Sequence, residues 1–399
     1  SETKQCSSPE KVSATRLSVG GSQRAKTESY TIFVIKNDNK LKIRVIIIAK
    51  RKITTGVTLL PFFIIITAFG VFMLYSPLTD FRIVTEEEFP LRINEIEDTV
   101  RAASVSGTLM SGDMPLYWRA DRVEGARAAV TIVHGFTEFS RKYDELCWYF
   151  MNMGYDVYVY DQRGHGLSGR ETDDASLAHV NSFDDYVNDL DAVIENVVHK
   201  YSPGLPVYLF THSMGGAVAA LYMCRCPDKV SKVLLSSPMV SPKTHGVPHK
   251  AVCRMIRREA EKNNSWDKMF RYAGHFEENV DFSKAADKSY NRFRHNLDMR
   301  IADKRYQNSS STNRWMTEAL QVRDRILDPA ALSRVTASVM IIAAEKDGVV
   351  CLHPQKKLAH MLGERCRYVM IKGAKHSIYV SGDEILETYI NTVRDFYGM

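Results

Sequence analysis

The sequence predicts an α/β protein with a mostly parallel central sheet and helices on both faces. From residue 100 onward, short apolar runs typical of buried strands alternate with amphipathic runs typical of helices. At the centre of this pattern, the β-branched and aromatic run 207–210 is followed by Ser213 and then by the small residues 215–220. A strand, a sharp turn and a helix follow one another there, which is how successive units of a parallel sheet begin.

The composition is that of a globular protein and gives no sign of a nucleic-acid, metal or cofactor partner. The 399 residues are 45% hydrophobic and 25% charged, as in an ordinary globular protein. The net charge of +6 is unevenly distributed: residues 1–52 carry +8, residues 245–337 carry +6, and the remainder is acidic. No nucleic-acid-binding motif accompanies the basic residues, so a nucleic-acid partner is not expected. The seven scattered cysteines predict free thiols, and no metal-ligand cluster or phosphate-binding Gly loop indicates a metal or cofactor.

The N-terminal region predicts a tail and a membrane anchor. We expect residues 1–52 to be a basic and largely disordered tail, within which 30–35 and 41–49 have the pattern of a small hairpin. Residues 53–76 contain no charge, and a membrane-spanning helix needs about 20 apolar residues. A cleaved signal peptide and a buried core helix are the alternatives. We expect a single transmembrane helix over 53–76, with the basic N-terminal side in the cytoplasm.

The body of the protein divides into three parts: a first core segment (77–244), an insertion (245–337) and a second core segment (338–399). A hairpin is expected around residue 112, and Ser182 and Asp185 have the spacing of a capping box that opens a helix. The expected strands of the core end at residues 133, 160, 210, 236, 344 and 371. The insertion is basic and contains many large apolar side chains, which predicts a mainly helical lid over the carboxyl ends of the strands.

Ser213 is the candidate nucleophile. A serine on a tight turn between strand and helix projects its hydroxyl into a cleft and has the helix N-terminus behind it. The motif G-x-S-x-G requires small neighbours, and Gly215 supplies one of them. Thr211 stands where the other Gly is expected, which is a departure from the motif. An ordinary serine in a βα turn is the alternative interpretation.

A serine nucleophile needs a base and an orienting carboxylate, which follow it in the order acid and then histidine in this architecture. Asp347 follows the strand that ends at residue 344, and Glu345 is the alternative acid. His376 lies in a Gly-containing turn after the last strand, whereas His134 and His165 are alternative bases at other strand ends. The backbone N–H groups of Met214 and Phe136 are the candidate donors for an oxyanion hole.

Several stretches between residues 76 and 399 resemble the lysophospholipase and monoacylglycerol-lipase branch of the α/β-hydrolase superfamily. They are Ser76-Pro-Leu-Thr-Asp-Phe81, His134-Gly135, Tyr160-Asp-Gln-Arg-Gly-His-Gly-Leu-Ser-Gly169, His179-Val-Asn-Ser-Phe-Asp-Asp-Tyr-Val-Asn-Asp189, His212-Ser-Met-Gly-Gly216 and Ile371-Lys-Gly-Ala-Lys-His376. The resemblance implies the α/β-hydrolase fold and places Ser213, Asp347 and His376 at the nucleophile, acid and base positions. Thr211 and the N-terminal extension depart from the family pattern.

Together these observations predict a membrane-anchored serine hydrolase that releases a fatty acid from a single-chain lipid ester. The positive insertion favours a phosphate-bearing lysophospholipid as substrate. Monoacylglycerol lipase, carboxylesterase and acyltransferase activities use the same acyl-enzyme and are alternatives. A non-catalytic binding module on this fold is the alternative from a different class, because fold alone does not give function.

Overall fold

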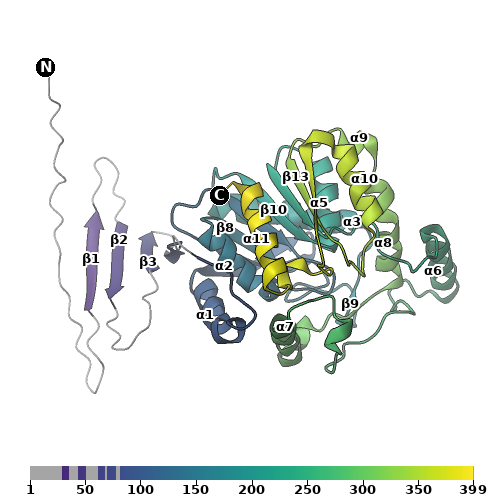
Figure 1. Cartoon of the computed structure of the whole chain (residues 1–399), viewed down its shortest axis with the longest axis horizontal. Helices are drawn as coiled ribbons and strands as arrows, with labels where there is room; N and C mark the ends of the chain where they lie inside the picture. Colours follow the sequence, from purple (N-terminus) through teal and green to yellow (C-terminus); the bar gives the residue numbers. More distant parts are fainter. Residues whose placement is uncertain (1–28, 36–43, 51–61, 68–69, 78–80, 399) are drawn as a thin grey trace.

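The computed structural model describes residues 29–35, 44–50, 62–67, 70–77 and 81–398 (Figure 1). An eight-stranded sheet forms the centre, with the strand order β14-β13-β11-β10-β7-β8-β6-β5. Its strands are β5 (Ser104–Ser111), β6 (Met114–Asp121), β7 (Ala129–Val133), β8 (Asp156–Tyr160), β10 (Val207–His212), β11 (Lys232–Ser236), β13 (Ser338–Ala344) and β14 (Cys366–Ile371). The strands from β7 to β14 pair in parallel, and the β5–β6 hairpin joins β8 in antiparallel pairing. The predicted sheet is confirmed.

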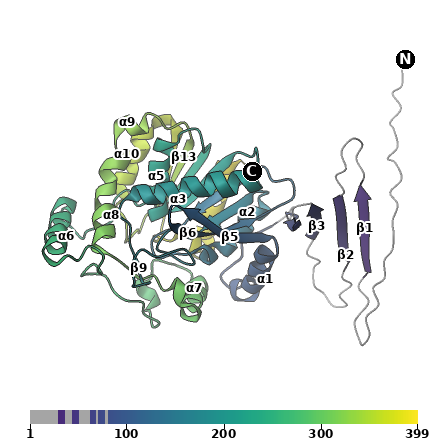
Figure 2. The ribbon, with the colours of Figure 1, turned by 180° about the vertical axis from the view of Figure 1, so that it is seen from behind.

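Helices cover both faces of this sheet (Figures 1 and 2). One face packs on α3 (Phe183–Val193), α5 (Met214–Arg225), α8 (Asn313–Ile326) and α10 (Leu352–Leu362), and the other on α1 (Phe89–Ala102), α2 (Asp144–Asn152) and α11 (Asp383–Tyr397). Successive side chains of β10 alternate between the two layers: Leu209 belongs to the first core and Phe210 to the second. Burial on both faces explains why these strands are continuously apolar in sequence.

Local capping agrees with the sequence at α3. The Ser182 side chain accepts from the backbone N–H of Asp184, and the Asp185 carboxylate accepts from the backbone N–H of Ser182, as in a capping box. These bonds satisfy N–H groups that a helix start otherwise leaves without partners. The capping box fixes where α3 begins, in the helical layer beside α5.

The N-terminal segment differs from the prediction. Where we expected a helix over 53–76, the structure has the antiparallel strands β3 (Phe62–Thr67) and β4 (Gly70–Tyr75). These runs are rich in Ile, Val and Phe, which favour extended backbone as readily as they fill a membrane helix. The hairpin predicted within the tail is confirmed as β1 (Ser29–Ile35) paired with β2 (Arg44–Lys50). The rest of the predicted tail and helix falls on residues 1–28, 36–43, 51–61 and 68–69, which lie outside the described residues.

No helix among the described residues combines the length and the apolar character that crossing a bilayer requires.

The insertion contains helices that lie in two different places. α6 (His249–Asn263) lies at the edge of the molecule and packs on α8, as both views show (Figures 1 and 2). Although α8 and the short α9 (Pro329–Leu332) fall within 245–337, they pack against α5 and belong to the helical layer of the sheet. α7 (Tyr290–Ala302) packs against α1.

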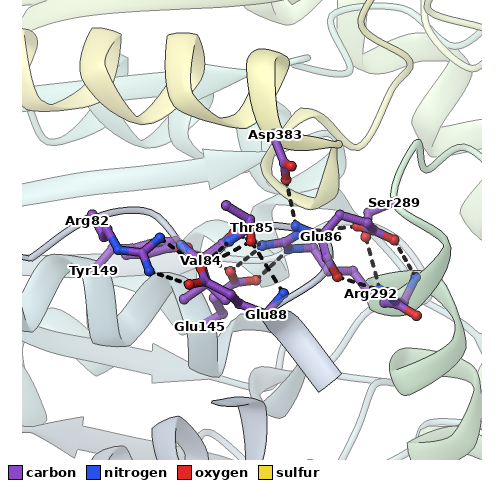
Figure 3. Close-up of polar contacts among 11 residues, drawn as sticks. Arg82, Val84, Thr85, Glu86, Glu88, Glu145, Tyr149, Ser289, Arg292 and Asp383 are labelled. Atoms are coloured by element: carbon purple, nitrogen blue, oxygen red, sulfur yellow. Dashed lines mark hydrogen bonds and ion pairs between the residues drawn. The ribbon is translucent and has the colours of Figure 1, made fainter. Parts of the chain in front are cut away.

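The first turn of α7 is fastened to the body by Arg292, whose side chain is buried (Figure 3). Its guanidinium donates to both carboxylate oxygens of Glu145 on α2, at 2.8 and 2.7 Å, and to the carbonyl of Val84 at 2.7 Å. Glu86 lies 3.4 Å from the same guanidinium and accepts from the backbone N–H of Asn291. We call Arg292, Glu145, Glu86 and the Val84 carbonyl the α7 latch. It joins the segment before α1 to the insertion.

Candidate active site

The turn between β10 and α5 holds Ser213 in a strained conformation. Its φ of 50° and ψ of −112° lie outside the regions that non-glycine residues ordinarily adopt. The backbone is fixed from both sides, because the Ser213 N–H donates to Ser236 O and the Ser213 carbonyl accepts from Met239 N–H. The predicted strand–turn–helix geometry is therefore present, with the serine at its apex.

Close packing explains the small residues of this turn. A Cβ on Gly215 would lie 2.0 Å from the carbonyl oxygen of Val133, so no larger residue fits there. A Cβ on Gly216 would lie 2.7 Å from the Cβ of Pro238. Thr211 fits in place of the expected Gly because its hydroxyl donates to Leu234 O at 2.9 Å, across the neighbouring strand β11. The departure from the motif is thus accommodated by a hydrogen bond.

Three side chains from three strand ends form one hydrogen-bonded chain. His376 Nε2 lies 2.9 Å from Ser213 Oγ, and His376 Nδ1 lies 2.8 Å from Asp347 Oδ2. The other carboxylate oxygen of Asp347 accepts from the backbone N–H groups of Val349 and Val350 at 2.8 and 2.9 Å. Ser213 and His376 are each only 6% exposed, so the chain is shielded from water. This is the arrangement that activates a serine hydroxyl.

Burial sets the protonation of this site. Burial lowers the pKa of His376, and the neighbouring His212 adds to that shift, while Asp347 opposes it. Burial alone would raise the pKa of Asp347, but its bonds to His376 and to the two backbone N–H groups outweigh it, and the pKa of Asp347 lies below its ordinary value. At neutral pH the imidazole is therefore uncharged and can accept a proton, beside an ionised carboxylate.

The alternative residues have other partners. Glu345 is exposed, and its carboxylate accepts from the backbone N–H of Gly373, which supports the turn before His376. His134 Nε2 accepts from the backbone N–H of Gln162 at 2.9 Å. His165 Nδ1 lies 2.9 Å from the carbonyl of Arg163. The structure brings Ser213 together with His376 and Asp347 rather than with any of these.

The two candidate oxyanion donors lie at adjacent strand ends. Met214 opens α5 directly after Ser213, so its N–H is one of the free donors of a helix N-terminus. Phe136 follows β7, which pairs in parallel with β10. Its ring stacks on Trp315 at a centroid distance of 4.2 Å, which fixes the loop. The placement is compatible with both predicted roles.

Sequence reasoning missed a buried charge cluster behind His376. The Glu138 carboxylate accepts from Gly135 N–H at 2.6 Å and lies 2.7 Å from Lys142 Nζ and 3.0 Å from His212 Nδ1. The ring of His212 lies 4.9 Å from that of His376. Burial favours a raised pKa for Glu138, but Lys142 and His212 hold it well below its ordinary value. Only the position of Glu138, four residues after His134 in the oxyanion loop, marked it in the sequence.

The loop that carries His376 is also bonded to the insertion. Ser377 N–H donates to Ala286 O at 3.3 Å, and Ser289 N–H donates to Val380 O at 3.3 Å. Lys375 Nζ donates to Ala285 O at 2.8 Å. The segment that leads into α7 therefore runs alongside the loop that carries His376.

The chain is similar to a family of serine hydrolases and to two lipid-ester hydrolases. The family model described as serine aminopeptidase, S33, matches residues 124–383. Lysophospholipase L2 of Escherichia coli (strain K12) is 28% identical over 300 residues, which cover 72% of this chain and 85% of that protein. Human monoglyceride lipase is 35% identical over 124 residues, covering 31% of this chain and 38% of that protein.

Solved structures show the same fold. Monoglyceride lipase from Saccharomyces cerevisiae superposes with a TM-score of 0.59 at 19% identity, covering 73% of this chain and 93% of that one. Monoacylglycerol lipase from Paleococcus ferrophilus gives a TM-score of 0.54 at 22% identity, covering 70% and 97%. With the family model spanning most of the chain, the protein belongs to the serine aminopeptidase S33 family of the α/β-hydrolase superfamily.

Proposed function

We propose that this protein is a serine hydrolase that releases a fatty acid from a single-chain lipid ester, in the first place a lysophospholipid. The observation that carries the proposal is the hydrogen-bonded chain from Ser213 through His376 to Asp347 at the carboxyl ends of β10, β14 and β13. The similarity to lysophospholipase L2 over most of the chain supports the substrate class, as do the shorter matches to monoglyceride lipases.

The reaction follows from the geometry. Ser213 Oγ attacks the ester carbonyl while His376 Nε2 takes its proton, and Asp347 stabilises the resulting imidazolium. The N–H groups of Met214 and Phe136 stabilise the tetrahedral oxyanion, after which His376 returns the proton to the leaving alcohol. Water, activated by the same histidine, then hydrolyses the acyl-enzyme and releases the fatty acid.

Fatty-acid release from lysophosphatidylcholine and from a monoacylglycerol of the same chain length tests this proposal. Ser213→Ala should abolish release from both, because loss of the nucleophile removes the acyl-enzyme route and costs rate by a factor of ~10⁶. A serine-directed fluorophosphonate probe should label the wild type at Ser213 and leave the variant unlabelled. Absence of both labelling and release in the folded wild type would favour a non-catalytic role.

We further propose that residues 53–76 hold the protein at a membrane, with the N-terminus in the cytoplasm. The absence of charge from this segment and the preceding Lys50, Arg51 and Lys52 support the proposal. The strands β3 and β4 do not support a helical anchor, so the proposal depends on composition and charge alone. Carbonate extraction of membranes tests it: the full chain should stay in the pellet, and a chain lacking residues 1–76 should be released.

A further inference from the structure

Among the residues that the structure describes, three buried arginines face carboxylates. Arg119 pairs with Asp121 and Asp144, Arg163 with Asp189 and Glu171, and Arg292 with Glu145 and Glu86. This is the expected pattern, because a charge removed from water is costly unless an opposite charge compensates for it.

Arg300, at the last turn of α7, departs from that pattern. Its guanidinium is partly buried, and it donates from Nε to Tyr306 O at 3.0 Å and from Nη2 to Asn308 O. The ring of Phe276 lies 4.7 Å from the guanidinium. Among the residues that the structure describes, no carboxylate lies within 4.0 Å of the Arg300 guanidinium. Its Nη1 donates no hydrogen bond to these residues. Burial accordingly lowers the pKa of Arg300 to about 10.

A second arginine of the same kind lies beside it. Arg170 donates to Asn308 Oδ1 at 3.3 Å, so the two guanidiniums meet at one residue. Its other bonds go to backbone carbonyls, those of Ser168, Gly166, Arg305 and Ala175. Burial lowers the pKa of Arg170 as well, and within the described chain it has no carboxylate within ion-pair distance. Two neighbouring positive charges, neither of them paired with a carboxylate of the described chain, provide a setting that suits an anion.

This pair adjoins the catalytic loops. The ring of Tyr306, whose carbonyl Arg300 binds, stacks on Phe139 at 4.2 Å, three residues after Phe136. Asn308 Nδ2 donates to Gly164 O at 2.8 Å, and the ring of the next residue, His165, lies 6.1 Å from that of Phe136. At longer range, the charge of Glu138 acts on Arg300 and that of Asp161 acts on Arg170. Both carboxylates already have other partners: Glu138 pairs with Lys142, and Asp161 accepts from the backbone N–H groups of Ser140 and Leu167.

We propose that Arg300, with Arg170 beside it, binds the phosphate group of a phosphate-bearing single-chain lipid ester next to the oxyanion loop. The assignment rests on the proposed function and names the headgroup that the site prefers. Arg300 presents a guanidinium already held in place by two carbonyls and flanked by an aromatic ring, so it binds an anion with little further loss of side-chain freedom. Arg170, whose donors are occupied by carbonyls, adds positive potential.

The test compares two substrates that differ only in headgroup, 1-acyl lysophosphatidylglycerol and a 1-monoacylglycerol with the same acyl chain. Arg300→Gln should lower kcat/KM for the lysophospholipid by about tenfold or more, since a charge-assisted hydrogen bond to phosphate is lost. Hydrolysis of the monoacylglycerol should change by less than about twofold, because the triad and the acyl contacts are untouched. Arg300→Lys should retain part of the preference.

Arg294 supplies a matched control on the same helix. It is exposed and pairs with Asp298, so Arg294→Gln removes one positive charge from α7 without touching the site. This control should leave both substrates unchanged. Equal losses on both substrates in Arg300→Gln, or no loss on either, would overturn the proposal, and so would an equal loss of the lysophospholipid activity in Arg294→Gln.

A binding measurement separates this proposal from the proposed function, because it needs no turnover. Dodecyl phosphate and the neutral ether 1-O-dodecylglycerol are titrated calorimetrically into Ser213→Ala and into Ser213→Ala with Arg300→Gln. The Kd for dodecyl phosphate should rise about tenfold in the double variant, while that for the ether stays the same. Equal affinity of both variants for dodecyl phosphate would overturn the assignment even if fatty-acid release is observed.

Discussion

The two ends of α7 carry the same type of side chain in opposite electrostatic settings. At the first turn, Arg292 is buried between Glu145 and Glu86 in the α7 latch (Figure 3). At the last turn, the partners of Arg300 within the described part of the chain are carbonyl oxygens and an aromatic ring. Carboxylates compensate the charge of the first guanidinium, whereas the second has no carboxylate partner among the residues described. The comparison indicates that one end of the helix serves stability and the other serves recognition.

The electrostatic difference also appears in the direction of the pKa shifts. Burial opposes the charge of both arginines, but the carboxylates raise the pKa of Arg292 above its ordinary value, whereas the pKa of Arg300 falls to about 10. A helix can thus be anchored by an ion pair at one end and carry an arginine without a carboxylate partner at the other. Three variants and one change of pH test how far the two ends of α7 differ in their contributions to stability and activity.

The largest effect is expected from breaking the latch. Arg292→Ala leaves Glu145 and Glu86 without their partner and should lower the free energy of unfolding by ~3–5 kcal/mol, because an unpaired buried charge remains. Urea denaturation followed by tryptophan fluorescence measures this loss. A loss below about 1 kcal/mol, a value within the range of exposed ion pairs, would contradict a stabilising role for the latch.

Acidification should lower kcat/KM of wild type and of Arg300→Met to the same extent. His376 must be uncharged to accept the proton of Ser213, and burial lowers its pKa below the ordinary value of 6.5. As the pH falls through that pKa the ring takes up a proton, so kcat/KM should be stable near pH 7 and then fall about tenfold per pH unit. Profiles of wild type and Arg300→Met on a monoacylglycerol should coincide. A midpoint above 6.5 would contradict the assigned environment of His376.

Removal of the uncompensated charge should cost little stability. Arg300→Met leaves no carboxylate unpaired and removes a desolvated guanidinium, so the free energy of unfolding should stay within about 1 kcal/mol of wild type. The same urea titration measures it. If Arg300→Met unfolded the protein as readily as Arg292→Ala, the distinction between the two ends of α7 would fail.

The smallest effect is expected at the exposed middle of the helix. Arg294 and Asp298 form an i,i+4 pair in solvent, and Arg294→Gln should change the free energy of unfolding by only ~0.3–0.5 kcal/mol. Raising the ionic strength should reduce this difference further, since salt screens exposed charges. A loss comparable to that of Arg292→Ala would show that charge anywhere on α7 matters.

The central fold was predictable because local patterns and topology agree. The strands and their parallel order follow from apolar runs that alternate with helices, and the capping box at Ser182 is visible as a four-residue pattern. The turn motif and the acid-then-histidine order predicted Ser213, Asp347 and His376 at the carboxyl ends of three strands, which the parallel sheet places along one edge. Their hydrogen bonds in the structure follow from that placement.

Other features could not be derived in this way. An apolar run rich in Ile and Phe is compatible with a helix or a strand, so residues 53–76 were predicted as helix, whereas 62–67 and 70–75 are extended in the structure. Glu138 and Arg300 lie in no motif, and their importance depends on which charges stand beside them after folding. Arg292 and Arg300 are indistinguishable in sequence, since only tertiary structure decides which one meets a carboxylate.

The backbone bonds between the insertion and the histidine loop have a consequence for substrate entry. Ala286 O and Ser289 N–H are held by Ser377 and Val380, directly beside His376. A hinge at residues 286–289 would pull the base away from Ser213, so an opening that preserves the hydrogen bonds of His376 would have to pivot elsewhere in the insertion. We expect hydrogen exchange to show slow amides at Ser289 and Ser377 and faster exchange along α6. Slow exchange along α6 as well would indicate that this part of the insertion does not open.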